Sequence, residues 1–235
     1  MNQLSIVIPI YNEKENIKYL FNEFKQYKIY EIVDEVIYID DCSTDGSLVE
    51  LNLIKKKYSK VIVLRHLRNF GQSKCLHTGI NHTKSSTIIT IDGDGQNNPR
   101  DISKLIKLYF SNNEISLVGG IRHKRKDNLI KIFSSKIANN FRKLILNDDC
   151  NDTGCSLKIF DRKEFLKIPY FNGMHRFLPA LFKGLGKKTK FINVDHRARI
   201  YGTSKYGTLK RLFYGIIDII RVLIIIKKFN NIQNK

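Results

Sequence analysis

Short apolar runs alternate with amphipathic stretches along the first hundred residues. An uninterrupted apolar run is typical of a strand buried on both faces. Five runs are therefore expected to form strands: Ser5–Ile10, Glu35–Asp40, Val61–Leu64, Thr87–Asp92 and Leu117–Gly120. Three intervening stretches have apolar residues at helical spacing: Glu15–Tyr27, Ser47–Lys57 and Ser73–His82. Strands and helices in alternation predict a single α/β domain with a mainly parallel central sheet.

The pattern is less regular after residue 120. A helix is expected near Leu129–Leu146, and a hairpin region around Thr153–Phe160. Leu212–Ile226 is apolar except for Asp218 and Arg221, and its 15 residues are fewer than the roughly 20 that span a bilayer. This segment predicts an amphipathic helix that lies in a membrane interface. Docking on the domain's own core or on a second subunit is the alternative.

Polar residues directly follow three of the predicted strands. They are Asn12-Glu13, Asp40-Asp41 and Asp92-Gly93-Asp94. Because ligands of open α/β sheets bind at the carboxyl ends of the strands, this common placement indicates a polar site. A second interpretation stays open for Asp40-Asp41, since Ser43, Thr44 or Asp45 could simply cap the helix that follows.

Asp92 and Asp94 are the candidate metal ligands. Paired carboxylates suit Mg²⁺ or Mn²⁺, and either ion can bridge a diphosphate. A calcium-binding EF-hand loop also begins Asp-x-Asp, but its sixth position is glycine and its twelfth glutamate, where this chain has Asn97 and Ser103. A polar turn without a ligand is the remaining alternative for the tripeptide taken alone.

The formal charge of +19 is distributed unevenly. Residues 1–100 carry 13 Lys and Arg against 12 Asp and Glu, whereas residues 101–235 carry 28 against 10. The second part of the chain therefore favours an anionic partner, which could be a phosphorylated substrate, an anionic membrane surface or nucleic acid. Nucleic acid is excluded as a partner, because no RNA- or DNA-binding motif accompanies the charge and the strand-end carboxylates would repel phosphate.

Seven motifs follow one another in order along the chain. They are Val7–Glu13, Asp40–Gly46, Arg68–Gly71 with Lys74 and Gly79, Ile89–Pro99 with the pattern DxDxQxxP, Asp152–Cys155, His175–Ala180 and His196–Gly207. Together they resemble family 2 glycosyltransferases, and in particular the branch of dolichyl- or polyprenyl-phosphate sugar synthases. The resemblance covers about residues 4–210.

The resemblance implies a GT-A fold and inverting transfer of a hexose from a GDP-mannose or UDP-glucose type donor to a polyprenyl monophosphate. Positions matching the nucleotide-sugar site are Pro9, Tyr11, Glu13, Asp41, Lys74, Asp92, Gln96 and Arg122. Positions matching the site of a divalent Mg²⁺ or Mn²⁺ cofactor are Asp92, Asp94 and Gln96. Basic positions expected at donor or acceptor phosphates are Arg122, Lys136, Arg199 and Lys205, and Lys136 stands where the family has arginine.

Two chemistries stay open for the acceptor. A lipid phosphate is already ionised near neutral pH, so it needs positioning by cations such as Arg199 and Lys205 more than it needs a base. A hydroxyl of a surface glycan would need a carboxylate base, and Asp152 is the best candidate. In both cases Asp94 is expected to help hold the metal that neutralises charge on the departing nucleoside diphosphate.

The chain is expected to divide into a glycosyltransferase domain of residues 1–210 and an amphipathic helix and tail of residues 211–235. The implied location is the cytoplasmic face of a membrane, with the protein bound peripherally. An anionic lipid surface or a membrane-anchoring partner protein would hold it there. The basic loop Arg122–Lys126 follows a predicted strand and is expected to close over the donor phosphate.

Overall fold

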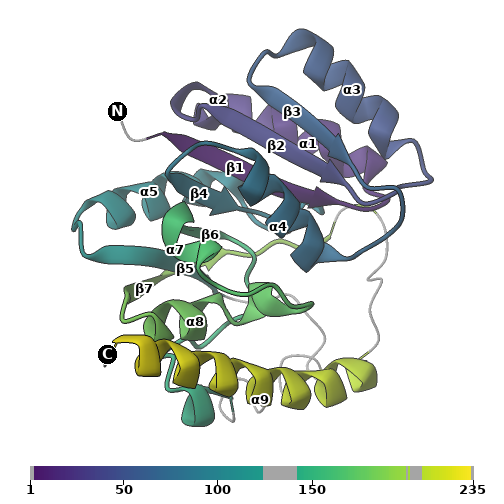
Figure 1. Cartoon of the computed structure of the whole chain (residues 1–235). Coiled ribbons are helices and arrows are strands. Elements are labelled where there is room, and N and C mark those ends of the chain that lie inside the picture. The colour runs from purple at the N-terminus through teal and green to yellow at the C-terminus, as the bar shows by residue number, and fades with distance from the viewer. Residues whose placement is uncertain (1–2, 124–141, 200, 202–207, 234–235) are drawn as a thin grey trace.

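The computed structural model describes residues 3–123, 142–199, 201 and 208–233, and within these one seven-stranded sheet has helices on both faces (Figure 1). The strands are β1 (Leu4–Ile10), β2 (Glu35–Asp40), β3 (Val61–Arg65), β4 (Thr87–Thr90), β5 (Ile115–His123), β6 (Lys158–Asp161) and β7 (Lys188–Asp195). The helices are α1 (Lys14–Gln26), α2 (Ile29–Ile32), α3 (Ser47–Lys57), α4 (Gln72–His82), α5 (Ile102–Phe110), α7 (Arg162–Leu166), α8 (Leu178–Gly184) and α9 (Thr208–Gln233). Two short 3₁₀ turns are Pro99–Asp101 and Met174–Arg176.

The strand order is β3-β2-β1-β4-β6-β5-β7. The first four strands in the sequence are parallel to one another, and β5 is parallel to β7. β6 is antiparallel to both of its neighbours, β4 and β5. The prediction of an α/β fold with a mainly parallel sheet is confirmed, and all five predicted strands are present.

The two faces of the sheet carry separate apolar clusters, because successive residues of a strand point to opposite faces. Along β1, Ile6 and Ile8 join the cluster that includes α1 and α5, whereas Val7 joins the cluster that includes α4 and α8. All three side chains are fully buried. Burial on both faces explains why the run is apolar without alternation.

The second half of the sheet differs from the sequence expectation. The region around Thr153–Phe160 does not form a hairpin, because Lys158–Asp161 form the single strand β6 between β4 and β5. The apolar pattern does not indicate β7, since most positions of this strand are exposed or half-buried and β5 is its one neighbour in the sheet order. Of the helix expected near Leu129–Leu146, residues 142–146 are helical and the earlier residues lie outside the described ranges.

α9 contains the apolar segment Leu212–Ile226 and extends beyond it at both ends. One face of α9 packs beside α8 (Figure 1), where Ile219, Val222 and Ile225 are buried in the same cluster as α8. The opposite face exposes five large aliphatic side chains: Ile216, Ile217, Ile220, Leu223 and Ile224. Docking on the domain's own core therefore accounts for one face of the helix only. In the ranges that the structure describes, no helix is both long and apolar enough to cross a bilayer.

Candidate active site

Three loops meet at the carboxyl edge of the parallel strands. β1 pairs in parallel with both β2 and β4, so the loops after these strands emerge on one edge of the sheet. The loops are Tyr11–Glu13, Asp41–Gly46 and Asp92–Gly95. Gly93 permits their close approach, because a Cβ atom there would lie 2.3 Å from Ile10 Cδ1 and 3.1 Å from the Pro9 carbonyl oxygen.

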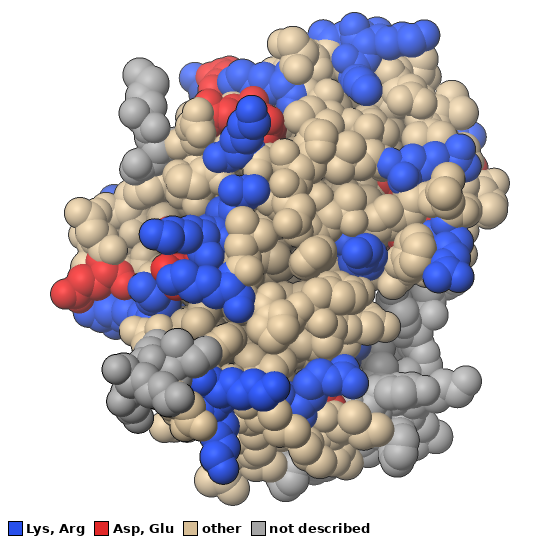
Figure 2. Space-filling view, viewed as in Figure 1, with Lys and Arg blue, Asp and Glu red and all other residues tan. Residues whose placement is uncertain are grey.

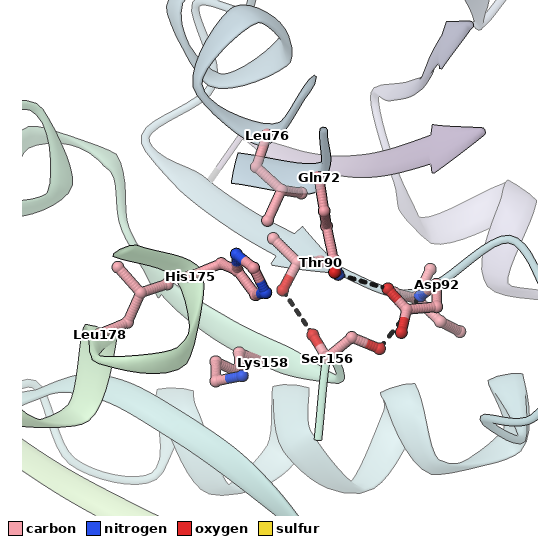
Figure 3. Close-up of a pocket in the computed structure, with 9 residues that line it drawn as sticks. Gln72, Leu76, Thr90, Asp92, Ser156, Lys158, His175 and Leu178 are labelled. Atoms are coloured by element: carbon pink, nitrogen blue, oxygen red, sulfur yellow. Dashed lines mark hydrogen bonds between the residues drawn. The ribbon is translucent and has the colours of Figure 1, made fainter. Parts of the chain in front are cut away.

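Asp92 lines a narrow pocket between β4, α4 and the start of β6 (Figure 3). Its carboxylate accepts a 2.7 Å hydrogen bond from the Gln72 side-chain amide, and its backbone N–H donates to Ser156 Oγ over 3.1 Å. Burial and the charge of Asp94 raise the pKa of Asp92 to about 7, although Ser156 and Lys158 act in the opposite direction. The negative charge at this position is thus only partly compensated by the chain itself.

Asp94 and Glu13 are bridged by Arg199. Nη2 of the guanidinium lies 2.6 Å from Asp94 Oδ2, and Nη1 lies 3.2 Å from Glu13 Oε1. The other oxygens of these carboxylates accept hydrogen bonds from Gln96 N–H at 3.1 Å and from the Asn16 side-chain amide at 2.7 Å. Asp94 and Glu13 are both 8% exposed, so water screens these charges weakly. The structure brings together three of the predicted site residues here.

The segment that carries Arg199 is anchored by Arg197. The Arg197 guanidinium makes hydrogen bonds of 2.6 and 2.8 Å to the two carboxylate oxygens of Glu23 and also donates to carbonyl groups in residues 95–97. Its backbone N–H donates to a carbonyl of the same short segment. These bonds attach the loop after Asp92 to the segment that follows β7. Arg199 lies on this segment, two residues after Arg197.

Arg122, near the end of β5, is paired with Asp152. Its Nε and Nη2 donate to the two carboxylate oxygens over 2.7 and 2.8 Å, and its backbone N–H donates over 3.1 Å. Three donors of one arginine therefore engage the carboxylate that was predicted as an alternative base. In the predicted loop Arg122–Lys126, residues 124–126 lie outside the described part of the chain.

Asp41 is satisfied by a neighbouring loop. It accepts hydrogen bonds from the backbone N–H groups of Phe70 and Gly71 at 3.0 and 2.7 Å, and His66 Nδ1 lies 2.7 Å from Oδ1. Asp41, His66 and Cys75 form the one group of three metal-ligating side chains within mutual reach in the described residues. We assign this group to loop organisation, because a 2.7 Å separation is a hydrogen bond and burial raises the pKa of the Cys75 thiol far above its usual value.

The oxygen donors of Asp92 and Asp94 fit a divalent cation of the Mg²⁺ or Mn²⁺ type. Both carboxylates are hard ligands that lie at one strand end, and the charge of Asp94 adds to the effect of burial in raising the pKa of Asp92. Gln96, the third predicted ligand, donates a hydrogen bond of 3.4 Å from its side-chain amide to the Arg197 carbonyl. That bond uses the amide nitrogen and not the amide oxygen that a metal would need.

The other predicted residues lie near this centre or outside the described ranges. Pro9 belongs to the end of β1, and Tyr11 follows it with 37% of its surface exposed. Lys74 lies near the start of α4. Lys136 and Lys205 are outside the described residues.

Three polar pocket residues were missed by the sequence analysis: Gln72, Ser156 and Lys158. Lys158 is 3% exposed, donates a hydrogen bond to the Cys155 carbonyl and lines the pocket beside Asp92 (Figure 3). A lysine inside the otherwise apolar run Leu157–Phe160 is a signal that could have indicated it. Gln72 carries no comparable local signal.

Comparison with known proteins gives one family. Residues 5–168 match the family model described as "Glycosyl transferase family 2". The chain is 33% identical over 226 residues to dodecaprenyl-phosphate galacturonate synthase of Rhizobium johnstonii, covering 94% of this chain and 66% of that protein. It is 29% identical over 225 residues to an undecaprenyl-phosphate 4-deoxy-4-formamido-L-arabinose transferase of Edwardsiella ictaluri, covering 91% and 66%. The chain thus spans just under two thirds of the length of these relatives.

Solved structures share the fold. Glucosyl-3-phosphoglycerate synthase of Mycobacterium tuberculosis, in complex with Mn²⁺, uridine diphosphate and glucosyl-3-phosphoglycerate, gives a TM-score of 0.69 at 18% identity, over 94% of this chain and 78% of that one. Mannosyl-3-phosphoglycerate synthase of Rubrobacter xylanophilus gives 0.69 at 13% identity, over 93% and 72%. At these identities the likeness shows the fold alone.

Proposed function

The chain belongs to glycosyl transferase family 2, and we propose that it transfers a sugar from a nucleotide sugar to a polyprenyl monophosphate, with a divalent metal ion as cofactor. The main support is the placement of half-buried Asp92 and buried Asp94 at one strand end, where Arg199 contacts Asp94 and the charge of Arg122 acts on Asp92. Dodecaprenyl phosphate and undecaprenyl phosphate appear in the names of the two relatives above, which favours this class of acceptor.

The donor diphosphate is proposed to lie over the loop Asp92–Gly95. A Mg²⁺ or Mn²⁺ ion held there by Asp92, Asp94 and Gln96 would neutralise charge that develops on the departing nucleoside diphosphate. The hydrogen bonds of Gln72 and Ser156 orient Asp92 for this role. Structural neighbours contain uridine diphosphate with Mn²⁺ or Mg²⁺, which favours such a cofactor and a UDP-type donor; a GDP-hexose donor is the alternative.

The acceptor is proposed to be an ionised phosphate and not a sugar hydroxyl. A hydroxyl needs a base to remove its proton, but Asp152 is already engaged by three donors of Arg122. A phosphate needs cations, and Arg199, with Lys136 and Lys205, is proposed to supply them. Pro9, Tyr11, Glu13, Asp41 and Lys74 are proposed to line the nucleotide side.

Product analysis tests this function directly. The purified protein would be incubated with undecaprenyl phosphate and a panel of GDP- and UDP-sugars, with Mn²⁺ or with EDTA, and the lipid fraction analysed by mass spectrometry. We expect a sugar on the lipid phosphate with Mn²⁺ and none with EDTA. Transfer only to hydroxyl groups of a glycan acceptor would instead favour the alternative that the enzyme elongates a surface glycan.

The outer face of α9 is proposed to bind an anionic membrane surface. Ile220 and Ile224 are each 54% exposed on this face, and Lys227 and Lys228 are exposed one turn further along. Figure 2 shows many Lys and Arg side chains and few acidic ones on the face of the molecule that includes α9. Aliphatic residues flanked by lysines are typical of a helix that lies in the interface of an anionic bilayer. The protein would then be peripheral on the cytoplasmic face, with residues 1–210 as the catalytic unit and residues 211–235 as the lipid-binding unit.

Vesicle sedimentation with two matched double variants tests this membrane role. Ile220→Glu with Ile224→Glu is expected to abolish binding to phosphatidylglycerol vesicles. Val49→Glu with Leu53→Glu places the same charges at the same spacing on α3, where the residues are 62% and 48% exposed, and should leave binding unchanged. The proposal would be contradicted if wild-type protein did not bind phosphatidylglycerol vesicles, or if it bound vesicles of neutral lipid equally well. Either result would favour an anchoring partner protein.

A further inference from the structure

Arg199 contacts Asp94, which is also a proposed ligand of the metal ion. Its guanidinium is 2.6 Å from Asp94 Oδ2 and 3.2 Å from Glu13 Oε1, and its side chain is 21% exposed. Asp94 is one of the two carboxylates that fit a divalent cation. A guanidinium on Asp94 Oδ2 reduces the negative charge that the same carboxylate offers to a metal ion, and the two cations repel each other, so they compete for Asp94.

We propose that Arg199 is a placeholder cation, which neutralises Asp94 and Glu13 before the metal binds, competes with the metal for Asp94, and passes to the substrate phosphates when the donor arrives. This inference rests on the proposed function, since it uses the same metal and donor site. It implies that the metal and the nucleoside diphosphate bind cooperatively, because each favours the state in which Arg199 has left Asp94.

The need for a placeholder follows from the local charges. Asp94 and Glu13 are each 8% exposed, and the Arg199 guanidinium contacts both carboxylates. Among the cations nearby, Arg122 is committed to Asp152 by two side-chain hydrogen bonds. An uncompensated buried carboxylate is strongly unfavourable, so a cation at Asp94 stabilises the site before any ligand is present.

Arg197 shows what a permanently placed arginine looks like in the same segment. It makes two hydrogen bonds to Glu23, donates to carbonyl groups in residues 95–97 and lies 5.5 Å from the centre of the Tyr19 ring. None of these contacts of the Arg197 guanidinium is with a side chain that is predicted to bind the metal ion. Arg199, in contrast, forms its ion pairs with Asp94 and Glu13 of the candidate site. Binding of the metal ion and the donor would change these ion pairs.

Mn²⁺ binding measured without any sugar transfer tests the inference. Calorimetry, or the electron paramagnetic resonance signal of free Mn²⁺, would give the Mn²⁺ Kd of the full chain alone and with uridine diphosphate. For Arg199→Gln we expect the Kd of Mn²⁺ alone to fall about tenfold, because a competing charge has been removed. The gain in Mn²⁺ affinity on adding uridine diphosphate should shrink in the same variant.

Arg65→Gln is the matched control. It removes the same charge from an arginine that is 54% exposed and lies 3.6 Å from Asp40, outside the metal loop, so its Mn²⁺ Kd should equal that of the wild type. Arg199→Lys keeps the charge but loses the forked contact, and an intermediate Kd is expected; it also serves if Arg199→Gln fails to fold by circular dichroism.

Two results would overturn the inference: Arg199→Gln binding Mn²⁺ no more tightly than Arg65→Gln, or wild-type protein binding no Mn²⁺ in either condition. Absence of sugar transfer to lipid phosphate would refute the proposed function while leaving the Mn²⁺ titrations interpretable.

Discussion

Two acidic loops at the same edge of the sheet, Asp41–Gly46 and Asp92–Gly95, differ in the partners of their carboxylates. Asp41 receives two backbone N–H groups and a histidine, all from residues 66–71. Asp92 receives a side-chain amide and keeps a pKa raised to about 7 by burial and by Asp94, while Asp94 shares an arginine from the far end of the domain. The carboxylate of the first loop is thus paired with nearby donors of the chain, whereas the second loop holds two carboxylates that repel each other and are the proposed ligands of a cation. Carboxylates at strand ends are thus distinguished by their partners and not by their position.

Loss of a proposed metal ligand should have the largest effect on activity. Asp94→Asn is expected to lower sugar transfer by about 10²–10³-fold, because charge on the leaving group is no longer neutralised. The melting temperature should change little, since the repulsion with Asp92 is removed together with the ion pair to Arg199, which keeps its contact with Glu13. Transfer rates and thermal unfolding measured on one preparation check both parts. Retention of more than a tenth of the activity would contradict the metal assignment.

Loss of the Asp41 carboxylate, which is also proposed to line the nucleotide side, should lower stability more than loss of the Asp94 carboxylate does. Asp41→Asn is expected to lower the free energy of unfolding by about 1–3 kcal/mol. The substitution replaces one acceptor oxygen by an NH₂ donor, so the backbone N–H groups of Phe70 and Gly71 would share a single acceptor. Urea unfolding of this variant beside Asp94→Asn gives the comparison. The distinction between the loops fails if Asp41→Asn is as stable as the wild type and Asp94→Asn is not.

The stability of metal-free protein should depend on pH through Asp92. Because the pKa of Asp92 is raised from 3.8 to about 7, the folded state holds a proton that the unfolded state releases. The associated stability is fully present below about pH 4 and is lost as the pH rises through about 7, with a slope of at most about 1.4 kcal/mol per pH unit. Urea unfolding in EDTA should show this slope in wild-type protein and a smaller one in Asp92→Asn. Equal slopes would mean that Asp92 is already fully compensated.

The smallest effect is expected at Asp45, which lies in the same loop as Asp41. Its carboxylate accepts hydrogen bonds from the N–H and hydroxyl of Ser47 and from Lys14 N–H. Asp45→Ala should therefore lower the free energy of unfolding by about 1 kcal/mol, measured by urea unfolding. Sugar transfer should fall far less than in Asp94→Asn, and a comparable fall would place Asp45 in the active site.

The local sequence pattern predicts the strands and the strand-end positions of this molecule, but few of its contacts between distant residues. The apolar runs locate β1 to β5 because burial of residues such as Val7 and Ile8 shapes the sequence directly. The strand-end position of Asp92 follows from the same pattern. Its partners do not, because the contact of Arg199 with Asp94 joins residues 105 positions apart. The surplus of basic residues predicts that cations are present, but only the fold decides which carboxylate each one meets.

The position of β6 has a consequence for how the protein folds. β6 lies between β4 and β5 although it follows both in the sequence. During synthesis β1 to β4 can pair as they emerge, whereas the edge of β4 stays open until Lys158–Asp161 arrive. Asp92 meets Ser156 only at that stage. Closure between distant segments is slow, so a refolding chain is expected to pair β1 to β4 first and to complete the pocket beside Asp92 last.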